Sequence, residues 1–298
     1  MMSPLSLRFV TLGFAACMLA ACGSTPEDTA HSSDSPAKNA RSNWPATLDN
    51  FRFQWSADPT INLTSPPASI VRAYVESHSI ANYTFDAANT YPGFERATPE
   101  NESTKSEQFR WQLLRVRPLG EGTVASAEDA RQQYGYQPLH VLELIPIDTG
   151  YRAILCFGDY SRFVTSSTQP GKFVSVVFNE ELGATVPIDN PGVGVRQVEL
   201  AQREAVTGST VPETPPAPQQ GPLPAPTDDV FGDWSVTGSS TSFWGSRDQF
   251  VDIASEYQDR CAAAMPDAPE VRRSMMSGIK NEPPPPGPPV PGWPDKAG

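Results

Sequence analysis

The sequence predicts an α+β fold, in which an N-terminal amphipathic helix packs on a mostly antiparallel, curved sheet and a C-terminal helix docks back on it. Three patterns support this fold class. Apolar residues share one helical face over 66–79, two β-rich segments form a hairpin over 139–158, and a second helical pattern runs from Phe250 to Ala264. Spacings of three and four residues are typical of helices that pack on one side, and alternation is typical of half-buried strands.

The first helix is expected to begin after Ser65, which is followed by two prolines. Serine is a favoured N-cap, and proline is tolerated in the first helical turn. The residues expected on its inner face are Ile70, Val71, Tyr74, Val75 and His78. A short half-buried strand at 51–55 precedes this helix.

The hairpin consists of segments 139–147 and 151–158, joined by Asp148, Thr149 and Gly150. Glycine suits the positive φ that such a loop requires. Ser126 and Asp129 resemble a capping box, which predicts a short helix that stops at Gly135. Further strands are predicted at 109–116, 172–178 and 193–201.

The first 21 residues have the pattern of an export signal. Arg8 is followed by an apolar run from Phe9 to Ala21, which is shorter than the roughly 20 residues that cross a bilayer as a helix. The run ends at Leu19-Ala20-Ala21-Cys22, which resembles the lipobox of bacterial lipoproteins. The resemblance implies that Cys22 carries diacylglycerol and anchors the chain outside the cytoplasm, at the cell membrane. The alternative is an ordinary secretory signal that leaves Cys22 as a thiol.

The chain has four cysteines, and an exported chain would keep two of them free to pair. Cys17 leaves with the signal and Cys22 takes the lipid, so Cys156 and Cys261 remain. Two thiols in an oxidising compartment usually form a disulfide. We therefore predict a Cys156–Cys261 bond that fixes the C-terminal helix on the sheet.

The distribution of the 32 prolines divides the chain, because two dense clusters lie at Pro212–Pro226 and Pro283–Pro294. Such clusters are typical of extended linkers and tails. The predicted organisation is a signal peptide (1–21), a lipidated flexible tether (22–48), an α+β domain (49–205), a Pro-rich linker (206–228), a C-terminal segment that docks on the domain (229–281) and a disordered Pro-rich tail (282–298).

The formal charge of −12 argues against nucleic acid as a partner, because an acidic surface repels phosphate backbones. Electrostatic docking to anionic lipid is disfavoured for the same reason, so the lipid on Cys22 would hold the protein at the membrane. The sequence contains none of the usual motifs for metals, nucleotides or other cofactors, and none is predicted. An envelope protein or a glycan remains as the partner.

Two histidines are candidates for acid–base chemistry. His78 lies on the inner helical face, and His140 lies in the first hairpin strand. If the helix crosses that strand, both side chains would line one cavity with a carboxylate such as Asp86 or Glu143. The alternative is that each histidine is hydrogen-bonded and structural.

Four aromatic residues between the first helix and the hairpin are candidates for a surface that stacks on sugars. They are Tyr83, Tyr91, Phe94 and Trp111. The alternative is ordinary core, because aromatic side chains dominate the burial energy of many domains.

A first helix followed by a curved sheet loosely resembles the NTF2-like cone. The resemblance implies a cavity between that helix and the sheet, near His78 and Trp111. Together these observations favour a non-enzymatic binding or scaffold lipoprotein of the cell envelope. The alternative is a small hydrolase or lyase that uses His78 or His140 as acid or base.

Overall fold

A curled sheet organises residues 43–185, 192–202 and 217–295, which are the residues that the computed structural model describes. Within them, seven strands form the main sheet. The helices and strands are β1 (Asn50–Ala57), α1 (Ala68–Thr84), α2 (Phe94–Ala97), β2 (Gln133–Ile147), β3 (Gly150–Gly158), β4 (Arg162–Thr165), β5 (Phe173–Ser175), β6 (Phe178–Asn179), β7 (Ala184–Thr185), β8 (Val193–Gln202), β9 (Trp234–Ser240), β10 (Phe243–Gly245), β11 (Phe250–Asp252), α3 (Ile253–Ala264) and α4 (Pro269–Met276).

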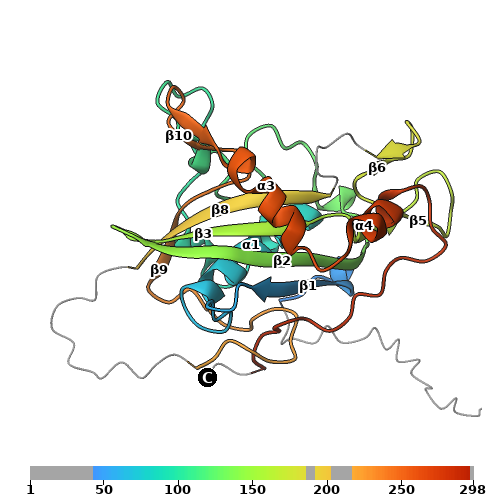
Figure 1. The fold of residues 1–298 in the computed structure, drawn as a ribbon, viewed down its shortest axis with the longest axis horizontal. Coiled ribbons are helices and arrows are strands. Elements are labelled where there is room, and N and C mark those ends of the chain that lie inside the picture. The colour runs from blue at the N-terminus through green and yellow to red at the C-terminus, as the bar shows by residue number, and fades with distance from the viewer. Residues whose placement is uncertain (1–42, 186–191, 203–216, 296–298) are drawn as a thin grey trace, which may run out of the picture. The chain divides into compact units, whose positions relative to one another are not determined.

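The main sheet is antiparallel along the order β5-β4-β2-β3-β8-β9, and β1 pairs with β2 in parallel. The long strand β2 carries a bulge against β3 between Val141 and Glu143. Bulges increase the local twist of a strand, and the sheet curves visibly along β2 and β3 (Figure 1). The predicted fold class, including the predicted hairpin, is confirmed.

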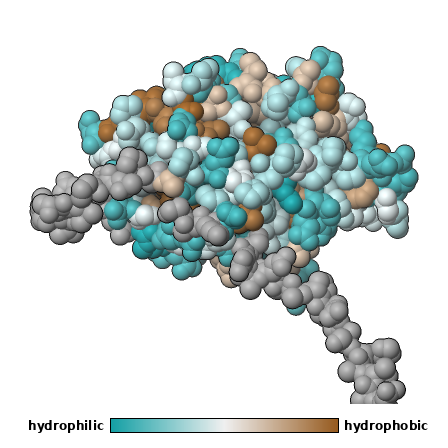
Figure 2. Space-filling model, turned by 90° about the horizontal axis from the view of Figure 1, so that it is seen from below, coloured by the Kyte–Doolittle hydropathy of each residue, from teal (hydrophilic) through white to brown (hydrophobic). Residues whose placement is uncertain are grey.

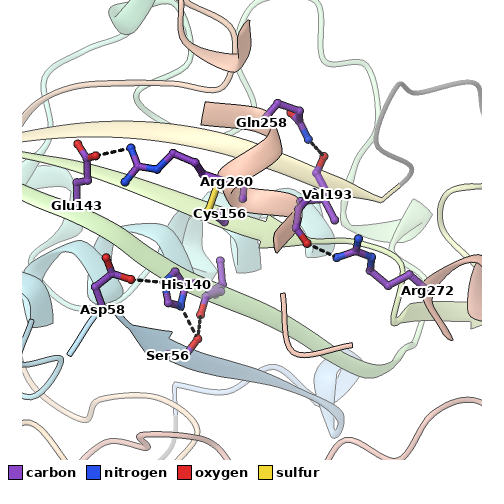
Figure 3. Close-up of a disulfide and its surroundings, with 12 residues drawn as sticks. Ser56, Asp58, His140, Glu143, Cys156, Val193, Gln258, Arg260 and Arg272 are labelled. Atoms are coloured by element: carbon purple, nitrogen blue, oxygen red, sulfur yellow. Dashed lines mark hydrogen bonds and ion pairs between the residues drawn. A yellow bond between two sulfur atoms is a disulfide. The ribbon is translucent and has the colours of Figure 1, made fainter. Parts of the chain in front are cut away.

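Helices α1 and α3 lie on opposite faces of this sheet (Figure 1). Leu139 and Val141 of β2 join the core cluster beneath α1, whereas Ile154 and Cys156 of β3 join the cluster beneath α3. Cys156 forms a disulfide with Cys261 of α3, with 5.1 Å between their Cα atoms (Figure 3). The predicted bond is confirmed, and it closes a loop of a length worth about 4.7 kcal/mol in the chain-entropy model.

Helix α1 is buried on its polar face as well as on its apolar face. Arg72 has no exposed surface, and its two terminal nitrogens donate to four backbone carbonyls. The acceptors are Leu63 at 3.0 Å, Gln219 at 3.0 Å, Pro291 at 2.6 Å and Gly292 at 3.3 Å. Segments distant in sequence therefore meet at one arginine.

Glu76 lies one turn after Arg72, with its Oε1 atom 4.0 Å from Arg72 Nε. Its carboxylate accepts hydrogen bonds from Trp55 Nε1 at 2.7 Å, Tyr91 Oη at 2.8 Å and Trp293 Nε1 at 2.7 Å. Burial raises the pKa of Glu76, and Arg72 and the three donors oppose that shift. All three donors favour the ionised carboxylate.

The two Pro-rich segments pack on the domain where the structure describes them, so the predicted linker and disordered tail are wrong for 217–228 and 282–295. Ala225 and Trp293 belong to the core under α1, and Leu223 and Trp293 exchange backbone hydrogen bonds of 3.1 and 2.8 Å. Proline prevents regular secondary structure but leaves the backbone carbonyls free to accept hydrogen bonds. Arg72 uses those carbonyls.

Other local predictions also need correction. The domain begins before residue 49, because Leu48 is fully buried and Trp44 packs against Phe53 at 6.1 Å. Segment 109–116 contains a short 3-10 helix (Trp111–Leu113) in place of a strand. The capping box at Ser126 is present, but it closes only a 3-10 turn (Ala127–Asp129) because β2 begins at Gln133. Predictions for residues 1–42, 203–216 and 296–298 lie outside the described residues.

Replacing Trp293 with alanine should lower the free energy of unfolding by about 3 to 5 kcal/mol, the usual cost of truncating a buried aromatic residue. The substitution also removes a donor to the buried carboxylate of Glu76. Urea denaturation of the wild type and variant measures the difference. Val290→Ala is the control, because its side chain is 45% exposed. An unchanged midpoint in Trp293→Ala would show that the C-terminal segment does not dock.

Candidate ligand pocket

A cavity of about 350 Å³ lies between the C-terminal half of α1, the loop that follows Trp111, and the edge formed by β8 and β9. We call it the arginine pocket, because Arg115, Arg117 and Arg196 line it together with the hydroxyl-bearing residues 239–242. His78 and Trp111 line it as well. A cavity next to these two residues is what the resemblance to the NTF2-like cone implied, although the resemblance itself stays a prediction.

His78 is buried, and hydrogen bonds occupy both of its ring nitrogens. Nε2 donates to the carbonyl of Arg115 at 3.0 Å, and Nδ1 accepts from Asn82 Nδ2 at 3.1 Å and from Arg196 Nη1 at 3.4 Å. Burial, reinforced by the positive charges of Arg196 and Arg115, lowers the pKa of His78 to about 3. The imidazole is neutral at pH 7 and has no nitrogen left for a substrate proton.

Arg196 enters the pocket from β8 without a carboxylate partner among the described residues. Its Nη1 donates to His78, and its Nε is buried without a hydrogen-bond partner. The buried Nε has left water without gaining a protein acceptor, and this costs free energy.

The other two arginines of the pocket differ in their pairing. Arg115 is exposed and forms no ion pair with any described residue. Arg117 lies 2.5 Å from Glu100, which is outside the pocket lining. None of the described residues that line this cavity is acidic, so their net charge is positive in a chain whose overall charge is −12.

The loop that closes the pocket is held in an uncommon backbone conformation. Leu119 has a φ of 55°, a left-handed conformation that costs a non-glycine residue about 1 to 2 kcal/mol. Asn82 Oδ1 accepts the backbone N–H of Leu119 at 3.2 Å, and Asn82 Nδ2 contacts His78. One amide side chain thus positions the loop and the histidine together.

Two further cavities adjoin the same residues. A cavity of about 150 Å³ shares His78, Asn82 and Arg196 with the arginine pocket. A more open cavity of about 680 Å³ also reaches Asn82 and is lined by both arginines and acidic residues. Only the arginine pocket combines several arginines with an entirely non-acidic lining.

His140 lies on the opposite face of the sheet from His78, so the expected shared cavity is wrong. It lies between Leu139 and Val141, which face α1, and pairs across strands with Cys156, which faces α3. Side chains directly opposite each other share a face of the sheet.

The two carboxylates that were expected beside the histidines also have other roles. Asp86 caps a short turn by accepting from Ala88 N at 2.9 Å. Glu143 pairs with Arg260 of α3 at 2.5 Å (Figure 3). Neither carboxylate lies with His78 in the arginine pocket.

His140 has its own polar partners on the α3 face. Its Nδ1 lies 2.9 Å from Ser56 Oγ, and its Nε2 lies 3.1 Å from Asp58 Oδ1 (Figure 3). Serine, histidine and carboxylate in this order match the composition of a nucleophilic triad. None of the three cavities described above includes these residues.

The expected aromatic surface is wrong for two of its four members. Tyr91 and Phe94 are each 1% exposed and belong to the core beneath α1. Tyr83 lines the two neighbouring cavities and carries Arg162 over its ring at 4.0 Å. Only Trp111 lines the arginine pocket, where its buried indole N–H has no partner.

The sequence did not single out Arg196, Arg115, Asn82 or the hydroxyl-bearing residues 239–242 as functional. Arg196 occupies a polar position in an alternating strand, a pattern shared by any solvent-facing residue. The run of hydroxyl-bearing residues at 239–242 is equally typical of a turn, so the sequence does not indicate a ligand site there. The pairing of β8 with β9 places Arg196 near residues 239–242, and α1 and the loop after Trp111 add Asn82 and Arg115.

Comparisons of the chain with protein-family models, curated proteins and solved structures found no match. Within the described residues, His, Cys, Asp and Glu form no group of three or more that could hold a metal ion. The chemistry of the pocket therefore has to be argued from its own residues.

Burial of neutral His78 should make the protein less stable in mild acid. The pKa of about 3 lies below the ordinary value of 6.5, so between these values the unfolded chain binds a proton that the folded chain does not. Stability therefore falls as the pH drops below 6.5, by about 2 kcal/mol at pH 5.

The variant His78→Gln lacks this titration and should lose about 2 kcal/mol less than the wild type between pH 7 and pH 5. Urea denaturation at both pH values measures the difference. An equal loss in both proteins would contradict a buried, neutral His78.

Proposed function

We propose that the chain is a lipid-anchored, extracytoplasmic lipoprotein whose folded part binds a small ligand in the arginine pocket. The anchor rests on the apolar run that ends at Leu19-Ala20-Ala21-Cys22. Among the described helices, none is long and apolar enough to cross a bilayer. In this proposal the lipid on Cys22 supplies the membrane attachment, because two acyl chains hold a protein stably where one does not.

Replacing Cys22 with alanine should move the protein from the membrane fraction to the soluble extracytoplasmic fraction, because the acceptor of the lipid is lost. Fractionation of a bacterial host followed by immunoblotting measures this shift. Cys17→Ala is the matched control, since Cys17 lies before the cleavage position. Retention of Cys22→Ala in the membrane would contradict the anchor.

The single observation that favours binding over catalysis is the pairing of His78. Both of its ring nitrogens are already engaged by Arg115, Asn82 and Arg196, and a pKa of about 3 lies far from the value that suits a general base at neutral pH. The histidine holds the arginine in place and is not poised to move a proton. Such a pocket is suited to holding a ligand.

The surface favours ligand binding in a pocket over protein binding through a broad apolar interface. The face in Figure 2 is mostly hydrophilic, with hydrophobic residues in small groups. Most of the exposed large hydrophobic residues, including Val124, Leu182 and Val271, are scattered along the chain, and only Phe250 and Val251 are adjacent, on β11. Scattered apolar residues of this kind are normal on soluble surfaces and do not indicate a partner.

A substitution that fills the pocket mouth should abolish ligand binding while leaving the fold intact. Thr241 is exposed and lines the pocket, so Thr241→Trp places an indole in its opening. Thr60→Trp is the matched control, because Thr60 is exposed and lines none of the three cavities. Both are made in the mature chain carrying Cys22→Ala.

Thermal unfolding is then measured with a panel of sugars, amino acids, organic acids and sugar phosphates. At least one compound should raise the Tm of the parent and Thr60→Trp, but not of Thr241→Trp, and should be recovered unchanged. A panel without effect, or an equal effect in Thr241→Trp, would contradict binding in this pocket.

The alternative function is hydrolysis, and the arrangement of Ser56, His140 and Asp58 is the observation that favours it. The binding proposal predicts no covalent labelling of the mature chain by a fluorophosphonate, which reacts with activated serines. Labelling that disappears in Ser56→Ala would identify a hydrolase on the α3 face and would contradict a purely binding role.

A further inference from the structure

Arg196 lacks the acidic partner that the partly buried Arg152 and Arg162 have. Arg152 lies 2.7 Å from Glu199, and Arg162 lies 3.4 Å from Asp159. Arg196 has only the neutral imidazole of His78, at 3.4 Å. Its positive charge is therefore uncompensated by any described carboxylate and faces the cavity.

The groups around Arg196 are hydrogen-bond donors, and together they suit a ligand with negatively charged oxygen atoms. Arg115 adds a second unpaired guanidinium, and Ser240, Thr241 and Ser242 add hydroxyls from the β9 edge. The buried Nε of Arg196 lacks an acceptor, as does Nε1 of Trp111. Guanidinium groups bind carboxylate and phosphate through two parallel hydrogen bonds, which gives both strength and orientation.

We propose that the arginine pocket binds a small molecule through an oxyanion, either phosphoryl or carboxylate, with Arg196 as the anchoring residue. This inference rests on the proposed function and names the class of its ligand. His78 acts as a positioning residue, because its Nδ1 accepts from Arg196 Nη1 while its Nε2 is fixed on the carbonyl of Arg115.

The size of the cavity restricts the ligand further. A volume of about 350 Å³ lies at the lower end of the range of roughly 300 to 1,000 Å³ for small-molecule sites. The uncharged part of the ligand would meet Trp111, Leu114 and Pro118. The site thus suits a compact metabolite with one charged end and one apolar or ring-shaped end.

Isothermal titration calorimetry of the mature chain carrying Cys22→Ala tests the inference with inorganic phosphate and with acetate as probes. Arg196→Gln should weaken binding by about 10- to 100-fold, the loss typical of a charge-assisted hydrogen bond. Arg196→Lys should weaken it less, because the charge remains and the fork is lost. Arg273→Gln removes the same charge from an arginine that is 62% exposed on α4 and should bind as the parent does.

Each outcome of the titration has a distinct meaning. Binding of phosphate alone identifies a phosphoryl group, binding of acetate alone identifies a carboxylate, and binding of both supports an oxyanion site without further choice. Failure of both probes to bind, or unchanged binding in Arg196→Gln, overturns the inference. A neutral compound that Thr241→Trp excludes and Arg196→Gln still binds would overturn it while leaving the proposed function intact.

Discussion

The buried pair of Arg72 and Glu76 is the interaction on which the rest of the fold depends. Removing two charges from water costs several kcal/mol per ion unless hydrogen bonds satisfy them. Arg72 donates to carbonyls at 63, 219, 291 and 292, and Glu76 accepts from three side chains that include Trp293. Strand β1, helix α1 and both Pro-rich segments therefore have to meet around this pair. The C-terminal segment supplies two of the carbonyls that accept from Arg72 and one of the donors to Glu76, so without it the buried pair would keep only part of its hydrogen bonds.

The same helix carries a second polar group one and a half turns further on, where His78 and Asn82 reach the arginine pocket. Arg72, which belongs to α1, and Arg196, which reaches His78 of α1 from β8, have different partners. The terminal nitrogens of Arg72 donate to four backbone carbonyls and its charge lies beside Glu76, whereas Arg196 has one neutral partner and no carboxylate among the described residues. The Nε atom of each arginine is buried without a hydrogen bond. Because the fold gives Arg72 both a carboxylate and carbonyl acceptors, the lack of either at Arg196 supports the proposal of a ligand there.

The sequence was sufficient to predict the hairpin and α1, because the periodicity that indicates each lies within one segment. It was also sufficient to predict the Cys156–Cys261 disulfide, because only two cysteines were left to pair. It was insufficient for the Pro-rich segments, because proline content predicts the absence of helix and strand but not the absence of packing. Trp293, a large apolar residue within the C-terminal proline cluster, is the residue by which that segment packs in the core. Arg196 was beyond prediction because its lack of a carboxylate is a property of the three-dimensional neighbourhood, and its alternating position fitted an ordinary surface residue.

The electrostatic contrast between pocket and surface has a consequence for selectivity. A chain with a net charge of −12 repels polyanions such as nucleic acids and acidic lipid surfaces over about a Debye length. A small oxyanion that enters the arginine pocket would meet guanidinium groups at close range, where solvent and salt screen their attraction less than over longer distances. The acidic exterior and the basic interior together favour compact anions over large ones. A lipid on Cys22 would complete this arrangement, because it holds the protein at a membrane whose charged headgroups its own surface would repel.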